Sequence, residues 1–452
     1  MVKLARTLRD HGAGRTLPVI LLSNRLTKTL ASSLDDGIRC METSDFSGPP
    51  VFFGANRSQT VTKKLVEGLR VIAQTKWLTP MMVHYKALVI GRQLKKVTQF
   101  LIDINPQVVV VSGDRNGGIE PIILRAARDL GIVSIIAPSA FSASVEGLFI
   151  ARRKAEGHRV SNKTYFKHLF PNQWRHDALS GEDLSFFGIA TTYAYNIHGM
   201  LSPNPWVLGG GLSDWILVDS DDVKKRYVAL GVEFDKILVT GHPDHDLLAT
   251  SLNQKNLTRS YIIEKYGLDR TKKVLVLCLP NWAEVGLKSW HWHWLENEFL
   301  CSCATQIDCN VLLSLHPSQN RDHYIFLTER YPPLKILDEK LAEVLPAIDV
   351  YFTGLSSSTV PWAVLVSVPT VIADHYPEKD HINFGLPGVI HVSQSRDLKN
   401  ILSQLVNNGD SFEKCEKQLV STEVYGKLDG KAVERIIEEI FNAQSRTCKE
   451  NL

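Results

Sequence analysis

The chain has 452 residues, too many for one ordinary hydrophobic core, because single cores stop growing at roughly 250–300 residues. Its hydrophobic fraction of 44% and charged fraction of 22% are ordinary for a globular protein, and a formal net charge of +3 does not support a nucleic-acid partner. No apolar run approaches the roughly 20 residues of a membrane span, and the basic N-terminus lacks the apolar segment of a signal peptide.

The seven cysteines are scattered, apart from Cys301, Cys303 and Cys309. An odd number without regular spacing indicates reduced thiols and a cytoplasmic protein. The three clustered cysteines lack further His or Cys ligands at zinc spacing, so we interpret them as small buried residues near the end of a helix. We expect no metal and no cofactor.

Short β-branched runs alternate along the chain with longer helical patterns, as is typical of parallel sheets built from βαβ units. In the first half, the pattern predicts strands at 17–22, 108–111, 132–136, 214–218 and 236–239. It predicts helices at 58–74, 82–104, 119–130 and 220–230. The run 108–111 is apolar throughout, as expected for a strand covered on both faces. Ser220, followed by two aspartates, predicts a helix N-cap.

The second half repeats this scheme. Strands are predicted at 273–279, 310–314, 350–352, 370–373 and 389–392, and helices at 284–307, 338–345, 361–366, 395–407 and 430–443. We therefore expect two Rossmann-like α/β domains, 1–248 and 249–425, followed by a C-terminal segment, 426–452, whose helix is a candidate to cross back to the first domain. The irregular segment 151–201 is interpreted as a family-specific insertion or an acceptor-side loop.

Four segments that contain candidate catalytic or binding residues directly follow predicted strands. In open α/β sheets, ligands bind at this end of the strands. The first is Ser112-Gly113-Asp114-Arg115. Asp114 is a candidate general base or sugar-hydroxyl ligand, and Arg115 is a candidate phosphate ligand. The alternative is that the two side chains pair and cap the helix that starts near Ile119. The second segment, 239–244, closes the first domain, and we expect it to be structural.

The third segment contains His316-Pro317 after the predicted strand 310–314. A histidine at this point can donate a hydrogen bond or a proton to a leaving phosphate. The fourth is the hydroxyl run Ser356, Ser357, Ser358 and Thr359, which precedes a helix with proline in its first turn. Hydroxyls and backbone N–H groups that converge at a helix N-terminus favour an anion, so this run predicts phosphate binding. A weaker feature is 280–284 with Trp290, Trp292 and Trp294 beyond it, which we attribute mainly to core packing.

The order of these segments resembles the GT-B superfamily of nucleotide-sugar enzymes, which includes the UDP-N-acetylglucosamine 2-epimerases. Asp114 and Arg115 match a GDR motif of the epimerases, and the stretch 215–246, ending VTGHPDHD, resembles the end of their first domain. The run from LHPSQ to TVIADHY resembles their nucleotide-binding half. The resemblance implies two Rossmann-like domains in the GT-B arrangement, with a nucleotide cleft between them.

The sequence departs from the epimerases at three points. Residues 135–138 hold no catalytic glutamate, residues 279–281 hold no histidine-arginine pair, and Trp362 stands where an acidic residue commonly holds the ribose. These departures argue against epimerase chemistry and against a UDP-type ribose contact.

A His-Pro followed by a Ser/Thr pair is instead similar to bacterial sialyltransferases and Kdo transferases, which use CMP-activated sugars. Transferases of CDP-glycerol type share a related serine-rich turn. This resemblance implies that His316 binds or protonates the departing phosphate, that Ser357 and Ser358 hold it, and that no metal is needed. Asp114 is the candidate base by position alone.

The leading hypothesis is a metal-independent GT-B glycosyltransferase that uses a CMP- or CDP-linked donor in the synthesis of surface polysaccharide or glycoconjugate. Its expected partners are a nucleotide-sugar donor and a glycan or lipid-linked acceptor. The basic runs near Arg9 and Arg152 leave open a peripheral contact with the inner face of the membrane. The alternatives are an enzyme like UDP-N-acetylglucosamine 2-epimerase and a non-catalytic nucleotide-sugar binding protein.

Overall fold

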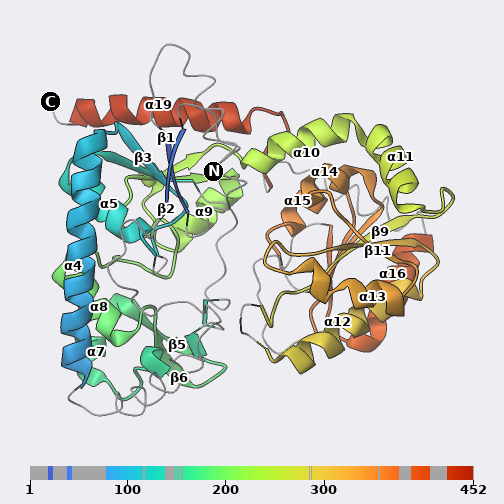
Figure 1. The fold of residues 1–452 in the computed structure, drawn as a ribbon, viewed down its shortest axis with the longest axis horizontal. Helices are drawn as coiled ribbons and strands as arrows, with labels where there is room; N and C mark the ends of the chain where they lie inside the picture. Colours follow the sequence, from blue (N-terminus) through green and yellow to red (C-terminus); the bar gives the residue numbers. More distant parts are fainter. Residues whose placement is uncertain are drawn as a thin grey trace.

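The computed structural model describes residues 19–23, 38–42, 78–115, 118–137, 148–149, 152–153, 156–284, 286, 288–354, 357–375, 388–407 and 425–450. These residues form two α/β domains, each built on a parallel sheet and drawn side by side in Figure 1. Within the described part of the chain, no helix combines the length and apolar character that a membrane span requires.

The N-terminal domain is built around the parallel sheet β3-β4-β7-β8. A separate parallel pair, β1-β2, and an antiparallel hairpin, β5-β6, accompany it. Its elements are β1 (Val19–Ser23), β2 (Ile38–Glu42), α4 (Leu78–Ile104), β3 (Val108–Val111), α5 (Glu120–Asp129), β4 (Val133–Ile136), α7 (Thr164–Leu169), β5 (Trp174–Asp177), β6 (Glu182–Ser185), α8 (Ile189–Ile197), β7 (Trp215–Val218), α9 (Asp221–Ala229) and β8 (Ile237–Val239).

The C-terminal domain is built on a six-stranded parallel sheet in the order β11-β10-β9-β12-β13-β14. Its elements are α10 (Pro243–Asn253), α11 (Lys255–Tyr266), β9 (Val274–Cys278), α12 (Trp290–Thr305), β10 (Asn310–Ser314), α13 (Ile325–Arg330), β11 (Leu334–Ile336), α14 (Leu341–Val344), β12 (Val350–Thr353), α15 (Val360–Leu365), β13 (Thr370–Ala373), β14 (Val389–Val392) and α16 (Ser395–Asn407). The last described element is α19 (Ala432–Glu450).

Alternation of side chains along the strands explains why each sheet is covered on both faces. In β3, Val109 and Val111 pack with the core under α4 and α5, whereas Val108 and Val110 face α19. The C-terminal sheet shows the same division. Leu275 and Leu277 of β9 face the core under α12 and α16, whereas Val274 and Val276 face the core on the other side of the sheet. The prediction that 108–111 is covered on both faces is confirmed.

The C-terminal helix α19 lies against the sheet of the first domain, across the top of the left-hand domain in Figure 1. Its apolar residues Val433, Ile436 and Ile440 recur at helical spacing and pack on β4 and β7. The carboxylate of Asp246, on α10, accepts the backbone N–H groups of Ala432 and Val433 at 2.7 and 2.9 Å, which caps α19.

The segment 239–244 makes structural contacts at the junction of the domains, and a structural role for it stays a prediction. The Thr240 carbonyl accepts a hydrogen bond from Arg435 of α19 at 2.8 Å, and His242 forms the N-cap of α10 through its contact with the Asp244 backbone N–H. Leu248 of α10 lies in the core of the C-terminal sheet, so the expected boundary after residue 248 falls inside this helix. The division into domains at 248 and 425 stays a prediction.

The predicted strands and helices largely match the structure, with some corrections. The helix predicted at 284–307 begins only at Trp290, because Ser289 caps it by accepting the Trp292 N–H at 3.2 Å. Helices α10 and α11 cover 243–266, where no helix was predicted. Strands β2 and β11 and the hairpin β5-β6 were not predicted, and the helix expected at 58–74 lies outside the described residues. Ser220 caps α9 as expected, by accepting the Val223 N–H.

The buried His245 makes the stability of the domain junction dependent on pH. Burial lowers the pKa of His245 to about 3, whereas an unfolded histidine titrates near 6.5. Below pH 6.5 this histidine is protonated in the unfolded chain but stays neutral in the folded chain. The free energy of unfolding therefore falls as the pH drops from about 6.5 toward 3.

We therefore expect His245→Gln to flatten the decline of the free energy of unfolding with falling pH, by up to about 1.4 kcal/mol per pH unit. Urea unfolding of wild type and variant between pH 7 and pH 4.5 measures this slope. His291→Gln, at an exposed position of α12, is the control and keeps the wild-type slope. Equal slopes in His245→Gln and wild type contradict the assignment.

Candidate functional site

The candidate site is formed by loops that leave three neighbouring strands of the C-terminal sheet at one level. Ser314 at the end of β10 is paired in register with Cys278 at the end of β9, and Cys278 with Thr353 at the end of β12. All three strands are parallel, so their next residues emerge at the same edge. That edge therefore presents Asn281, His316 and the turn 357–359.

Close packing joins the loop after β9 to the loop after β12. A Cβ atom on Gly354 would lie 2.8 Å from Cδ of Pro280 and 2.4 Å from Cδ1 of Leu300, so only glycine fits between them without displacement. On its other side, the β9 loop reaches the β10 loop through Asn281. Its Nδ2 lies 3.2 Å from Nδ1 of His316 and 3.0 Å from Oγ of Ser318.

The imidazole of His316 is held with a defined orientation. Its Nδ1 accepts the backbone N–H of Ser318 at 3.1 Å and lies 2.7 Å from the Ser318 hydroxyl. An Nδ1 that accepts a backbone N–H carries no proton, so this network assigns the neutral ring its proton at Nε2. Burial lowers the pKa of His316, which keeps the ring neutral near pH 7. His316 thus presents one N–H donor.

A network of hydrogen-bonded, buried polar side chains supports the loop that carries His316. The side-chain oxygen of Gln319 accepts the His316 backbone N–H at 2.6 Å, and its amide nitrogen donates to the Tyr324 hydroxyl at 2.7 Å. Tyr324 in turn contacts Glu284 and, at 2.8 Å, Nε2 of His293. Gln319, Tyr324 and His293 are all buried, so they fix the loop that carries His316. These contacts could not be predicted from the sequence, because the residues that make them belong to separate segments.

The serine-rich turn is organised around Thr359. Its hydroxyl lies 2.5 Å from that of the fully buried Tyr351 and 2.9 Å from that of Ser357. Ser358 is half-buried, and its side chain makes no hydrogen bond within the described part of the chain. Ser356 lies outside the described residues. Helix α15 has six residues, so its dipole adds less than a full-length helix would.

Asp114 and Arg115 lie in the other domain, after β3. Asp114 is 5% exposed, and its carboxylate accepts the backbone N–H groups of Gly209 and Gly211 at 3.2 and 2.7 Å. Burial raises its pKa. The guanidinium of Arg115 is buried and donates to the Trp206 carbonyl at 3.1 Å. The Asp114 carboxylate accepts from the 209–211 loop and not from the first turn of α5, so the capping part of the alternative is not observed, whereas the opposite charges of Asp114 and Arg115 attract each other.

The structure therefore brings His316 together with Asn281 and Ser318, and Ser357 together with Thr359, but no described contact joins either group to Asp114 or Arg115. One contact across the domains reaches this region, between the rings of His242 and Trp362, whose centroids are 5.5 Å apart. Trp362 lies on α15 directly behind the serine-rich turn. The loop after β9 also holds stacked aromatic rings, with the Trp282 and Trp292 centroids 4.5 Å apart.

The described residues contain no group of three or more His, Cys, Asp or Glu side chains that could hold a metal ion. Metal independence stays a prediction. Cys301, Cys303 and Cys309 are buried at the end of α12 and before β10, as expected for small apolar residues.

Comparison with solved structures confirms the expected GT-B architecture. A protein from Listeria monocytogenes assigned as a UDP-N-acetylglucosamine 2-epimerase is similar with a TM-score of 0.51, 12% identity and coverage of 98% of this chain and 92% of that chain. The calicheamicin glycosyltransferase CalG4 is similar with a TM-score of 0.51, 14% identity and coverage of 98% and 95%. At these identities the likeness is one of fold. Among functionally curated proteins, none matches the sequence.

The match to a family model goes further. Residues 214–442, about half of the chain, match the model described as CDP-Glycerol:Poly(glycerophosphate) glycerophosphotransferase. The match runs from β7 through the whole C-terminal sheet to α19, and so includes His316 and the serine-rich turn. The predicted class, a GT-B transferase of surface-polymer synthesis that uses a nucleotide-linked donor, is confirmed. The chain belongs to the CDP-glycerol:poly(glycerophosphate) glycerophosphotransferase family.

Proposed function

We propose that this protein transfers a glycerophosphate-type group from a CDP-linked donor to a hydroxyl of a glycan or lipid-linked acceptor. The observation that carries the proposal is the orientation of His316, whose Nδ1 is occupied by Ser318 while its Nε2 is left to donate at the edge of the sheet. Asn281 and Ser358 lie on the adjoining loops of the same edge, which gives the donor phosphates several polar contacts.

The family description names glycerophosphate as the transferred group, so we propose that the reacting atom is phosphorus rather than an anomeric carbon. The acceptor oxygen bonds to the phosphorus that carries glycerol, and the bond from that phosphorus to the bridging pyrophosphate oxygen breaks. CMP leaves with the electron pair of that bond, and the hydroxyl proton passes to a base. Charge grows on the CMP phosphate, where the His316 N–H and a serine hydroxyl stabilise it.

For Asp114 we propose a positioning role. A base must reach the proton that it removes, but both Asp114 oxygens accept backbone N–H groups of the 209–211 loop and only 5% of the residue is exposed. The carboxylate holds that loop against β3. That Asp114 is instead the acceptor base stays a prediction, and Asp114→Asn tests it, because asparagine retains one acceptor oxygen for the loop but has no basicity.

We expect His316→Ala to lower the turnover of CDP-glycerol by about 10²- to 10³-fold, as does loss of one donor to a developing oxyanion. Phosphorus NMR follows the conversion of the pyrophosphate to CMP and a phosphodiester, in the presence of a glycerophosphate acceptor. Ser358→Ala removes one neutral donor, and we expect a smaller loss. His291→Ala, at an exposed histidine of the same domain, is the control and retains wild-type turnover.

Two outcomes would contradict the proposal. Wild-type turnover in His316→Ala would remove His316 from the site. Conversion of UDP-N-acetylglucosamine to its 2-epimer by the wild-type chain, without turnover of CDP-glycerol, would establish the epimerase alternative.

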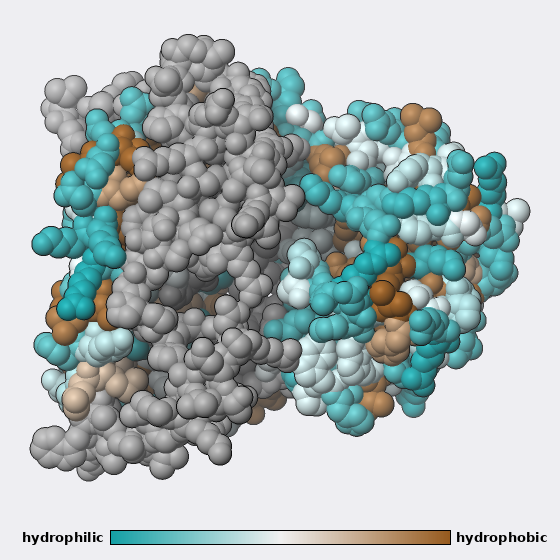
Figure 2. Space-filling model, viewed as in Figure 1, coloured by the Kyte–Doolittle hydropathy of each residue, from teal (hydrophilic) through white to brown (hydrophobic). Residues whose placement is uncertain are grey.

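We also propose that the outer face of α4 contacts an anionic membrane surface, where a lipid-linked acceptor is found. Met81, Tyr85 and Leu88 follow one another at helical spacing and are 68%, 51% and 49% exposed. Further along the helix, Arg92, Lys95 and Lys96 are exposed. Figure 2 shows hydrophobic patches along the left edge of the molecule, where Figure 1 draws α4. An apolar stripe beside cations is the pattern of helices that lie on anionic lipid.

Sedimentation with lipid vesicles tests this contact. We expect binding to vesicles of phosphatidylcholine with phosphatidylglycerol and weaker binding to phosphatidylcholine alone. The triple variant Met81→Gln, Tyr85→Gln, Leu88→Gln should bind about tenfold less, since it removes about 1.4 kcal/mol or more of apolar burial. Leu257→Gln changes a leucine of α11 that is 74% exposed, and this variant should bind as wild type does. Equal binding by the triple variant contradicts the proposal.

A further inference from the structure

A largely buried carboxylate, that of Glu284, lies in the network that supports the loop of His316. Only 10% of its side chain is exposed, and none of the described Lys or Arg side chains forms an ion pair with it. The Nε2 atom of His293 lies 3.9 Å from this carboxylate. Burial lowers the pKa of His293, although the charge of Glu284 opposes this effect, so the imidazole is neutral near pH 7. His293 therefore does not neutralise the charge of Glu284.

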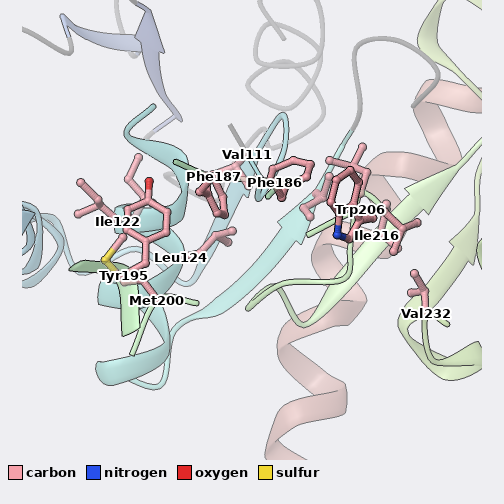
Figure 3. Packing of buried hydrophobic residues seen from close by; sticks show 14 of the residues in the cluster. Val111, Ile122, Leu124, Phe186, Phe187, Tyr195, Met200, Trp206, Ile216 and Val232 are labelled. Atoms are coloured by element: carbon pink, nitrogen blue, oxygen red, sulfur yellow. The ribbon is translucent and has the colours of Figure 1, made fainter. Parts of the chain in front are cut away.

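A carboxylate in this place is costly to the fold. In the N-terminal core, apolar side chains fill the interior, and Figure 3 shows Phe186 between Phe187 and Trp206 there. A charge that leaves water without a cationic partner loses hydration free energy that hydrogen bonds return only in part. Charged groups that are kept under such conditions are typical of functional sites. The burial of Glu284 therefore indicates a function rather than a contribution to stability.

The Glu284 carboxylate sets the direction of a chain of hydrogen bonds that runs through Tyr324. The Tyr324 hydroxyl has one proton, and it contacts both Glu284 and the side-chain nitrogen of Gln319, the latter at 2.7 Å. A carboxylate can only accept a hydrogen bond, whereas an amide nitrogen can only donate one. The hydroxyl proton therefore points to Glu284, and the hydroxyl oxygen accepts from Gln319. Burial and the contact with Glu284 raise the pKa of Tyr324, which keeps this proton in place.

The Gln319 side chain extends this order to two loops of the candidate site. Its nitrogen donates to Tyr324 and to the Pro280 carbonyl, 3.3 Å away, so its oxygen faces the His316 backbone N–H at 2.6 Å. Pro280 and Asn281 belong to the loop after β9, and His316 belongs to the loop after β10. One amide thus joins the two loops whose side chains, Asn281 and His316, lie 3.2 Å apart. The same amide turned by 180° would present a donor to the His316 N–H and lose these contacts.

We propose that Glu284 is a positioning residue of the transfer reaction and acts on His316 through this chain of hydrogen bonds. The assignment rests on the proposed function, in which His316 donates to the phosphate of the departing CMP. The carboxylate does not have to touch the donor. It forces the direction of the hydrogen bonds that join the two loops, so Asn281 and His316 meet the pyrophosphate without rearrangement.

The central variant is Glu284→Gln, which removes the charge and keeps the size of the side chain. Glutamine offers Tyr324 either an oxygen or a nitrogen, so the direction of the chain is no longer forced. We expect the turnover of CDP-glycerol to fall about tenfold, the difference between a charge-assisted and a neutral hydrogen bond. The melting temperature should stay equal or rise, because a largely buried charge is removed. A merely structural role predicts instead that turnover and melting temperature fall together.

Further variants test the path of the effect. Tyr324→Phe removes the hydroxyl, and we expect it to lower turnover at least as much. Glu284→Gln added to Tyr324→Phe should lower turnover no further, because Glu284 acts through that hydroxyl, and losses that multiply contradict the chain. The controls are Glu329→Gln, at an exposed glutamate of α13, and Tyr331→Phe, whose hydroxyl donates to the Glu298 carbonyl. Both controls keep wild-type turnover.

Hydrogen exchange of the His316 amide tests the positioning without any substrate. In full-length protein with isotopically labelled histidine, NMR detects this amide, whose signal is identified by its loss in His316→Ala. We expect Glu284→Gln to speed its exchange about tenfold and Glu329→Gln to leave it unchanged, because only the first variant loosens the hydrogen bond to Gln319.

Failure of this inference differs from failure of the proposed function. Wild-type turnover in Glu284→Gln, or a melting temperature that falls together with turnover, overturns the positioning role while the proposed function stands. Absence of CDP-glycerol turnover in the wild-type chain overturns the proposed function, and exchange of the His316 amide then decides whether Glu284 orders the loop. Unchanged exchange in Glu284→Gln overturns the inference in either case.

Discussion

The register of three parallel strands is the constraint on which the candidate site depends. Because Ser314, Cys278 and Thr353 end their strands at one level, the loops that follow emerge side by side. The fit of Gly354 against Pro280 and the contact of Asn281 with His316 then join the loops. A slip of one residue in any of these strands would turn its side chains to the opposite face and separate the polar groups. The buried chain from Gln319 to Tyr324 adds rigidity, so His316 does not have to be ordered by its ligand.

The C-terminal domain carries the candidate donor site, and two helices connect this domain with the N-terminal one. The C-terminal domain offers N–H and hydroxyl donors on backbone turns, which suit a pyrophosphate whose charge changes during the reaction. Helix α19 belongs in sequence to the end of the chain yet completes the sheet of the first domain, and Asp246 caps it from α10. The connection between the two domains therefore depends on this junction.

Much of the fold could be predicted from sequence, because buried parallel strands are continuous apolar runs and their helices have a 3.6-residue period. Strands β3, β10, β13 and β14 and helix α16 were predicted with their observed bounds. Short polar strands such as β5 and β6 carry no such signal. His316 and the serine-rich turn could be found because they follow strands. The contacts of Asp114 and Arg115 could not be predicted. Their partners, Gly209, Gly211 and Trp206, are more than 90 residues away in sequence. Burial of a charged group, unlike strand periodicity, is decided by tertiary contacts.

The most direct test of the central claim is a crystal structure of the chain with CDP-glycerol. The account predicts that a pyrophosphate oxygen lies within hydrogen-bond distance of Nε2 of His316 and that another is bound by the turn containing Ser357 and Ser358. It also predicts that the bound nucleotide leaves the Nδ1 contact of His316 with Ser318 unchanged. A nucleotide bound elsewhere, or a His316 ring that rotates away from Ser318 to bind it, would contradict the claim that the strand register builds the donor site in advance.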